Sequence, residues 1–124
     1  MRNAWLGLAL LPYLAAAGGD AWMHERGRRV PRPEQWVHAG LAAAMAVFLG
    51  AVFAAVPLVA ICALAAFAAA MPVALGALAA FIALVAWDET AFHRTIGPAE
   101  RRVHMFSWAA LAAFVAAWLL VDLA

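Results

Sequence analysis

The sequence predicts an all-α integral membrane protein, a four-helix bundle built from two repeated helical hairpins within one domain, residues 1–124. Three observations support this prediction: an apolar composition, charged residues confined to two short windows, and an acid–histidine motif that occurs four times. Hydrophobic residues make up 69% of the chain and charged residues 12%, whereas a soluble domain carries about 25% charged residues. The net charge of +1 offers no basic surface to nucleic acid, so the expected partner is a lipid bilayer.

The apolar stretches between the charged windows predict the helices. Of the fifteen charged residues (8 basic and 7 acidic), all but Arg2 and Asp122 lie within residues 20–34 or 88–102. The uncharged stretches are 3–19, 35–87 and 103–121. A helix needs about 20 apolar residues to cross roughly 30 Å of hydrocarbon, so the outer stretches match one crossing each and the middle stretch matches two.

The arginines predict the orientation. Both charged windows are arginine-rich, and such loops stay on the cytoplasmic side, which requires an even number of crossings between them. We therefore expect four transmembrane helices with both termini outside, in a plasma membrane of the bacterial inner-membrane type. Their expected ranges are 4–24, 34–56, 72–93 and 100–122.

Three alternatives to this topology stay open. A five-helix protein would place three short crossings within 35–87, with the two windows on opposite faces. The surplus segment 58–71, bracketed by Pro57 and Pro72, could extend a helix or lie along the outer interface. The first helix could also be a cleaved secretory signal, although its apolar stretch is long for one.

One pentapeptide pattern, an acid followed four residues later by a histidine, occurs four times and includes every histidine of the protein. Two copies flank each basic loop, so the chain divides into repeat 1 (about 1–56) and repeat 2 (about 72–124). The copies are Asp20–His24, Glu34–His38, Glu89–His93 and Glu100–His104.

The spacing predicts a metal site near the cytoplasmic face. Residues i and i+4 share one face of a helix, so each copy points a carboxylate and an imidazole in the same direction. If the four faces converge, one layer holds two acids and two histidines, and so does the next layer.

Unpaired carboxylates at a bilayer boundary are costly, and divalent cations would neutralise them. We expect two ions in a dinuclear centre; iron is the first expectation, and zinc or manganese also suits nitrogen and oxygen ligands. The expected layers are Asp20, His38, Glu89 and His104, and His24, Glu34, His93 and Glu100. Glu25 and Asp88 stay open as further ligands, hydrogen-bond partners of the imidazoles, or arginine partners.

This ligand set resembles that of the ferritin-like di-iron carboxylate four-helix bundles, in which inward-facing acids and histidines hold two metals. The resemblance covers the motif residues alone. It departs from that family's pattern, which has Glu-x-x-His on two helices, whereas this chain has acid-x-x-x-His on four.

The resemblance and the ligand set together favour an oxidoreductase that acts on a hydrophobic small molecule. The alternatives are a non-enzymatic transition-metal carrier or sensor, a dizinc hydrolase, and a haem-binding membrane protein. Residues 39–86 contain no ionisable side chain except Cys62, which argues against an ion path across the membrane. The single cysteine excludes an internal disulfide and a thiolate cluster, and the oligomeric state stays open.

Overall fold

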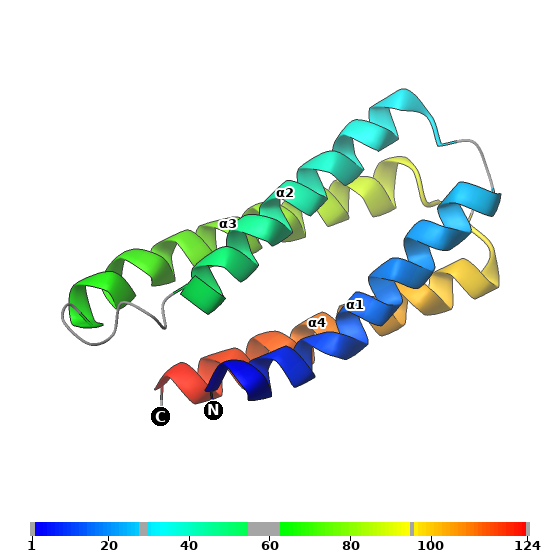
Figure 1. Cartoon of the computed structure of the whole chain (residues 1–124). Coiled ribbons are helices and arrows are strands. Elements are labelled where there is room, and N and C mark those ends of the chain that lie inside the picture. Colours follow the sequence, from blue (N-terminus) through cyan, green and yellow to red (C-terminus); the bar gives the residue numbers. More distant parts are fainter. Residues whose placement is uncertain (1, 28–29, 55–62, 95, 124) are drawn as a thin grey trace. The chain divides into compact units, whose positions relative to one another are not determined.

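Four α-helices make up most of the described part of the chain, which is residues 2–27, 30–54, 63–94 and 96–123 of the computed structural model (Figure 1). They are α1 (Arg2–Gly27), α2 (Arg32–Ala54), α3 (Ala63–Ala91) and α4 (Pro98–Leu123). No strand occurs in these ranges, so the all-α prediction is confirmed. Pro57 and Cys62, which the sequence singled out, lie outside the described residues.

Three of the helices are long and apolar enough to cross a membrane: Arg32–Phe53, Ala69–Ala91 and Pro98–Asp122. They correspond to the second, third and fourth predicted crossings. Helix α1 is not among them; its sequence includes Pro12 and Asp20, which are less favourable in hydrocarbon than its leucines. The chain therefore has the helices of a membrane protein, while the crossing by α1 and the side on which the termini lie stay predictions.

The ends of the helices follow from local sequence. Helix α3 begins at Ala63, before the predicted start, and continues through Pro72, so residues 63–71 extend the helix. A proline inside a helix removes one backbone hydrogen bond, which the long apolar helix tolerates. Helix α4 begins with Pro98, whose fixed φ suits the first helical position, and Arg101 N donates to Gly97 O at 3.0 Å in the first turn.

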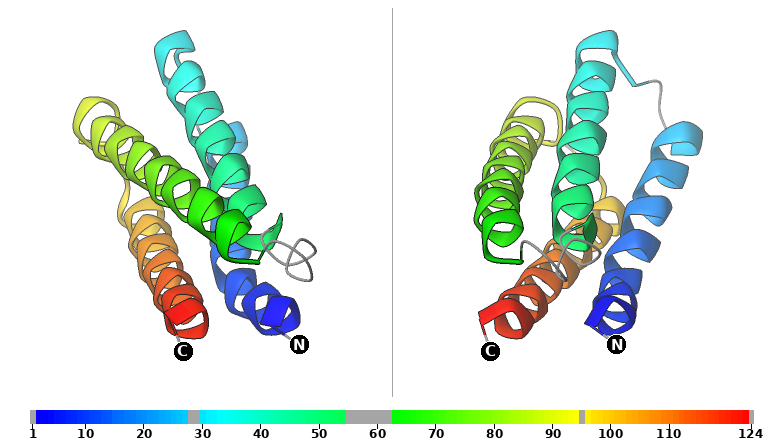
Figure 2. Two further views of the ribbon diagram at one scale, coloured as in Figure 1. Left: turned by 90° about the vertical axis from the view of Figure 1, so that its left-hand side faces the viewer. Right: turned by 60° about the vertical axis from the view of Figure 1, so that its left-hand side comes forward.

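The helices pack as two compact units, α1 with α4 and α2 with α3 (Figures 1 and 2). The first unit comprises Met1–Val30 with Thr95–Ala124, and the second comprises Pro31–Arg94. In each unit the two helices run antiparallel. Each predicted repeat along the chain therefore contributes one helix to each unit.

The α1·α4 unit has an aromatic core and a polar clamp at its terminal end. Phe114 and Trp118 of α4 are fully buried, as is Leu6 of α1. Next to them, Arg2 Nε donates to Asp122 Oδ1 at 2.7 Å and a second guanidinium nitrogen donates to Oδ2 at 2.6 Å. Trp118 Nε1 donates to the same carboxylate at 2.7 Å. This two-pronged ion pair joins the first turn of α1 to the last turn of α4 and fixes their antiparallel register.

The α2·α3 unit depends on close packing of apolar side chains. Phe48 and Val52 of α2 are buried, and so is Phe81 of α3. Gly40 of α2 allows α3 to come near, because a Cβ atom there would lie 3.2 Å from Leu84 Cδ1. Small residues let apolar helices approach each other, and van der Waals packing then holds them together in lipid.

We expect Asp122→Asn to destabilise the α1·α4 unit by about 1–3 kcal/mol, because it leaves the Arg2 guanidinium without its charged partner. The apparent melting temperature in detergent, followed by circular dichroism, measures the loss. Arg2→Gln should cost a similar amount, and the double variant should lose less than the sum of the two. Arg26→Gln, at the opposite end of α1, is the control. Additive losses in the double variant would contradict the pairing.

Candidate metal centre

In the α1·α4 unit, two acids and two histidines lie against each other across the helix pair. Asp20 Oδ1 of α1 lies 2.9 Å from His104 Nε2 of α4 and 3.4 Å from His24 Nδ1. His24 Nε2 in turn lies 3.5 Å from Glu100 Oε1 of α4. The two imidazole rings are stacked, with centroids 6.2 Å apart and planes inclined by 9°. The unit therefore brings all four of its motif residues into one cluster.

The α2·α3 unit contains a second cluster of the same composition. His38 Nε2 of α2 lies 3.9 Å from Glu34 Oε1 and 3.5 Å from Asp88 Oδ2 of α3. His93 Nδ1 lies 3.0 Å from Asp88 Oδ2, and its Nε2 lies 3.6 Å from Glu34 Oε1. The rings of His38 and His93 are also stacked, 6.4 Å apart and inclined by 9°. Each unit thus has two carboxylates and two parallel imidazoles.

Helix geometry explains the α1·α4 cluster and the α2 half of the second cluster. Within α1, α2 and α4, the acid and the histidine are four residues apart and share a face. Because the helices of each unit are antiparallel, the last turns of one helix lie beside the first turns of its partner. Each unit therefore juxtaposes a motif at the end of one helix with a motif at the start of the other.

The third motif departs from this geometry, because α3 ends at Ala91 and His93 lies beyond the helix. The spacing of four residues no longer determines which acid faces the histidine. Asp88 of α3, like Glu34 of α2, contacts both His38 and His93, and Glu89 is half-buried one position further along α3. The sequence named Glu89 as the ligand and left Asp88 open. One sequence feature could have favoured Asp88: Gly97 and Pro98, a few residues later, indicate that the helix ends close to His93.

Burial makes these groups unusual for a membrane boundary. Glu34 is fully buried, and His24, Asp88 and His93 are each at most 5% exposed. Asp88 Oδ1 is buried and accepts no hydrogen bond from any described residue. Most buried carboxylate oxygens in proteins have a hydrogen-bond partner, and an unsatisfied one indicates a water or an ion. The position of this oxygen therefore fits a bound cation.

The tautomer of His24 also suits a metal ligand. Its Nδ1 lies 3.0 Å from the backbone carbonyl oxygen of Asp20, which can only accept, so Nδ1 carries the proton. In the neutral ring the lone pair is then on Nε2, the atom that faces Glu100. Histidines that bind metals commonly have one ring nitrogen fixed in this way by a second hydrogen bond.

Taken together, the buried histidine and carboxylate side chains could hold a metal ion. Imidazole nitrogen and carboxylate oxygen are ligands for iron, manganese and zinc. The side chain of Glu25, which the sequence left open, lies outside the described part. Trp22, Trp36 and Trp87 are more than half exposed, and Trp22 lies against the Arg26 guanidinium at 4.7 Å, as interfacial tryptophans do.

No protein-family model, curated protein or solved structure matches the chain. Its class is therefore defined by its own fold and site: an all-α protein with membrane-type helices and buried acid–histidine groups that could hold a metal. The likeness to ferritin-like bundles rests on the motif residues alone.

The register at the end of α3 can be tested by two neighbouring substitutions. We expect Asp88→Asn to weaken Co²⁺ or Zn²⁺ binding at least tenfold, because the amide cannot replace a buried charged ligand. Glu89→Gln should change the affinity less than threefold. Isothermal titration of metal-depleted protein in detergent measures both. A larger loss in Glu89→Gln than in Asp88→Asn would show that the acid four residues before His93 is the ligand.

Proposed function

We propose that the protein is a membrane-embedded metal-binding protein that holds two divalent ions, iron first among them. The observation that carries the proposal is the pair of matching clusters, each with two imidazoles and two carboxylates that come from both chain segments of its unit. One such cluster could be a set of local salt bridges. The recurrence of the same four groups, together with a buried Asp88 oxygen that has no donor among the described residues, supports a ligand role.

Each kind of residue has a distinct role in this proposal. The four carboxylates, taken from Asp20, Glu34, Glu100 and either Asp88 or Glu89, would neutralise the cations and could bridge them. The imidazoles of His24, His38, His93 and His104 would act as terminal ligands held by the carboxylates of their own cluster. We include in this proposal the dinuclear centre predicted from the sequence. Magnetic coupling between the two bound ions would be the measurement that detects it.

We further propose an oxidoreductase that acts on a hydrophobic molecule taken from the bilayer. Bound iron would supply one-electron redox chemistry, and the surrounding apolar helices would exclude water and admit an apolar substrate. The nearly buried His24 and His93 would keep their ring orientation during the reaction. A carrier or sensor that binds the same ions without turnover is the alternative, and a dizinc hydrolase is the other enzymatic version.

Elemental analysis of detergent-purified protein tests the metal proposal. We expect about two metal equivalents per chain, with at least one lost in each of His38→Ala and His104→Ala, because each removes a ligand from a different cluster. Gln35→Ala, next to Glu34 on an exposed position, should keep both. Unchanged metal content in both histidine variants would overturn the proposal, and a haem absorption band would replace it with the haem-binding alternative.

Oxygen consumption by the reduced, iron-loaded protein then separates the enzymatic versions. Uptake above that of His38→Ala supports the oxidoreductase. Two bound ions without uptake contradict it and support a carrier or sensor. Zinc as the native metal, with hydrolysis of an ester substrate, would support the dizinc hydrolase instead.

A further inference from the structure

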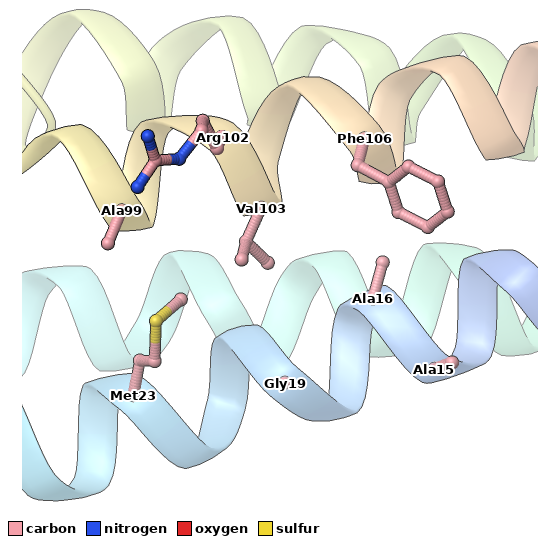
Figure 3. Close-up of a pocket in the computed structure, with 8 residues that line it drawn as sticks. All are labelled: Ala15, Ala16, Gly19, Met23, Ala99, Arg102, Val103 and Phe106. Atoms are coloured by element: carbon pink, nitrogen blue, oxygen red, sulfur yellow. The ribbon is translucent and has the colours of Figure 1, made fainter.

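A groove of about 350 Å³ lies along the α1·α4 unit, beside its acid–histidine cluster (Figure 3). Small residues of α1, Ala15, Ala16 and Gly19, form one wall, and Val103 and Phe106 of α4 form the other. Its volume falls within the range of about 300–1,000 Å³ typical of sites for small molecules. Four of these wall residues are exposed or half-buried and Ala16 is buried at the base, so the groove is open at the surface of this helix pair.

The groove changes in character from one end to the other. Figure 3 shows the Arg102 guanidinium at the end formed by Ala99 and Met23, whereas the phenyl ring of Phe106 lies toward the other end, across from Ala16. Arg102 belongs to the first turns of α4, where the sequence predicts the membrane interface, and Phe106 lies deeper along the helix. The direction from cation to apolar wall is therefore the direction from headgroup region to hydrocarbon.

Arg102 is also the one charged residue among the described residues that line the groove. Two carboxylates of the unit contact histidines, Asp20 with His104 at 2.9 Å and Glu100 with His24 at 3.5 Å. An exposed guanidinium presents a fork of donors that matches two phosphate oxygens. The groove thus combines an anion-binding end, formed by Arg102, with apolar walls.

We propose that this groove binds an anionic phospholipid: Arg102 holds the lipid phosphate, and the groove holds the part of one acyl chain that is nearest the headgroup. The small side chains of α1 leave room for the chain, and Phe106 packs against its methylene groups. The proposal concerns the groove alone and does not depend on metal. Only its extension, that this lipid lies close enough to the cluster to be a substrate, rests on the proposed function.

Native mass spectrometry in detergent, with chelator-treated protein, tests the proposal. Phosphatidylglycerol and phosphatidylcholine with identical chains are the probes. We expect phosphatidylglycerol to bind about tenfold more tightly, since only its headgroup has a net negative charge for Arg102. Arg102→Gln should remove this preference, whereas Arg101→Gln, an exposed neighbour outside the groove, should keep it.

A second pair of variants tests the apolar walls of the groove. Gly19→Leu should fill the groove and weaken binding of both lipids at least fivefold. A Cβ atom at Gly19 would meet nothing within 4 Å, so the substitution fits the fold, and Gly18→Leu is the matched control because the same holds there. Equal loss in Arg101→Gln and Arg102→Gln, unchanged binding in Gly19→Leu, or equal affinity for the two lipids would overturn the proposal. A dimer that dissociates in Gly19→Leu would also overturn it, because a second copy would then occupy the groove.

Discussion

In each unit, two carboxylates and two imidazoles lie between helices that are otherwise almost entirely apolar, and these polar groups depend on one another. A buried carboxylate without a partner is costly in a low-dielectric environment, and so is a buried imidazolium. Contacts of 2.9–3.9 Å between acids and histidines meet this requirement within each helix pair. The antiparallel pairing of α1 with α4 and of α2 with α3 is the arrangement that brings the complementary groups together.

Polar contacts hold one of the two units, α1·α4, at both of its ends. In the α1·α4 unit, the Arg2–Asp122 ion pair joins the helices at the terminal end, and the acid–histidine cluster joins them near the loop windows. Between the two, the contact consists of apolar and aromatic side chains such as Phe114. Polar groups thus fix the register of a pair whose apolar faces alone would allow sliding, since van der Waals packing is weakly directional.

Two clusters of equal composition also have a chemical consequence. A single acid–histidine contact is a common way for polar side chains near a helix end to find a hydrogen-bond partner. Two imidazoles and two carboxylates on each helix pair, with a buried Asp88 oxygen that accepts no hydrogen bond from the described residues, offer more ligand atoms than mutual salt bridges require. That surplus supports a cation at the site.

The sequence by itself determined the all-α fold, the apolar helices and the four acid–histidine motifs, because composition and the spacing of four residues are local properties. It did not determine that α3 would start at Ala63, since a proline such as Pro72 is a breaker in water and is tolerated in a long apolar helix. The tertiary structure alone decided which helices pair and that Asp88, the residue before the third motif, contacts His38 and His93. The reason is physical: α3 ends before His93, so the backbone beyond the helix, rather than helical periodicity, sets the direction of that imidazole and brings Asp88 against it.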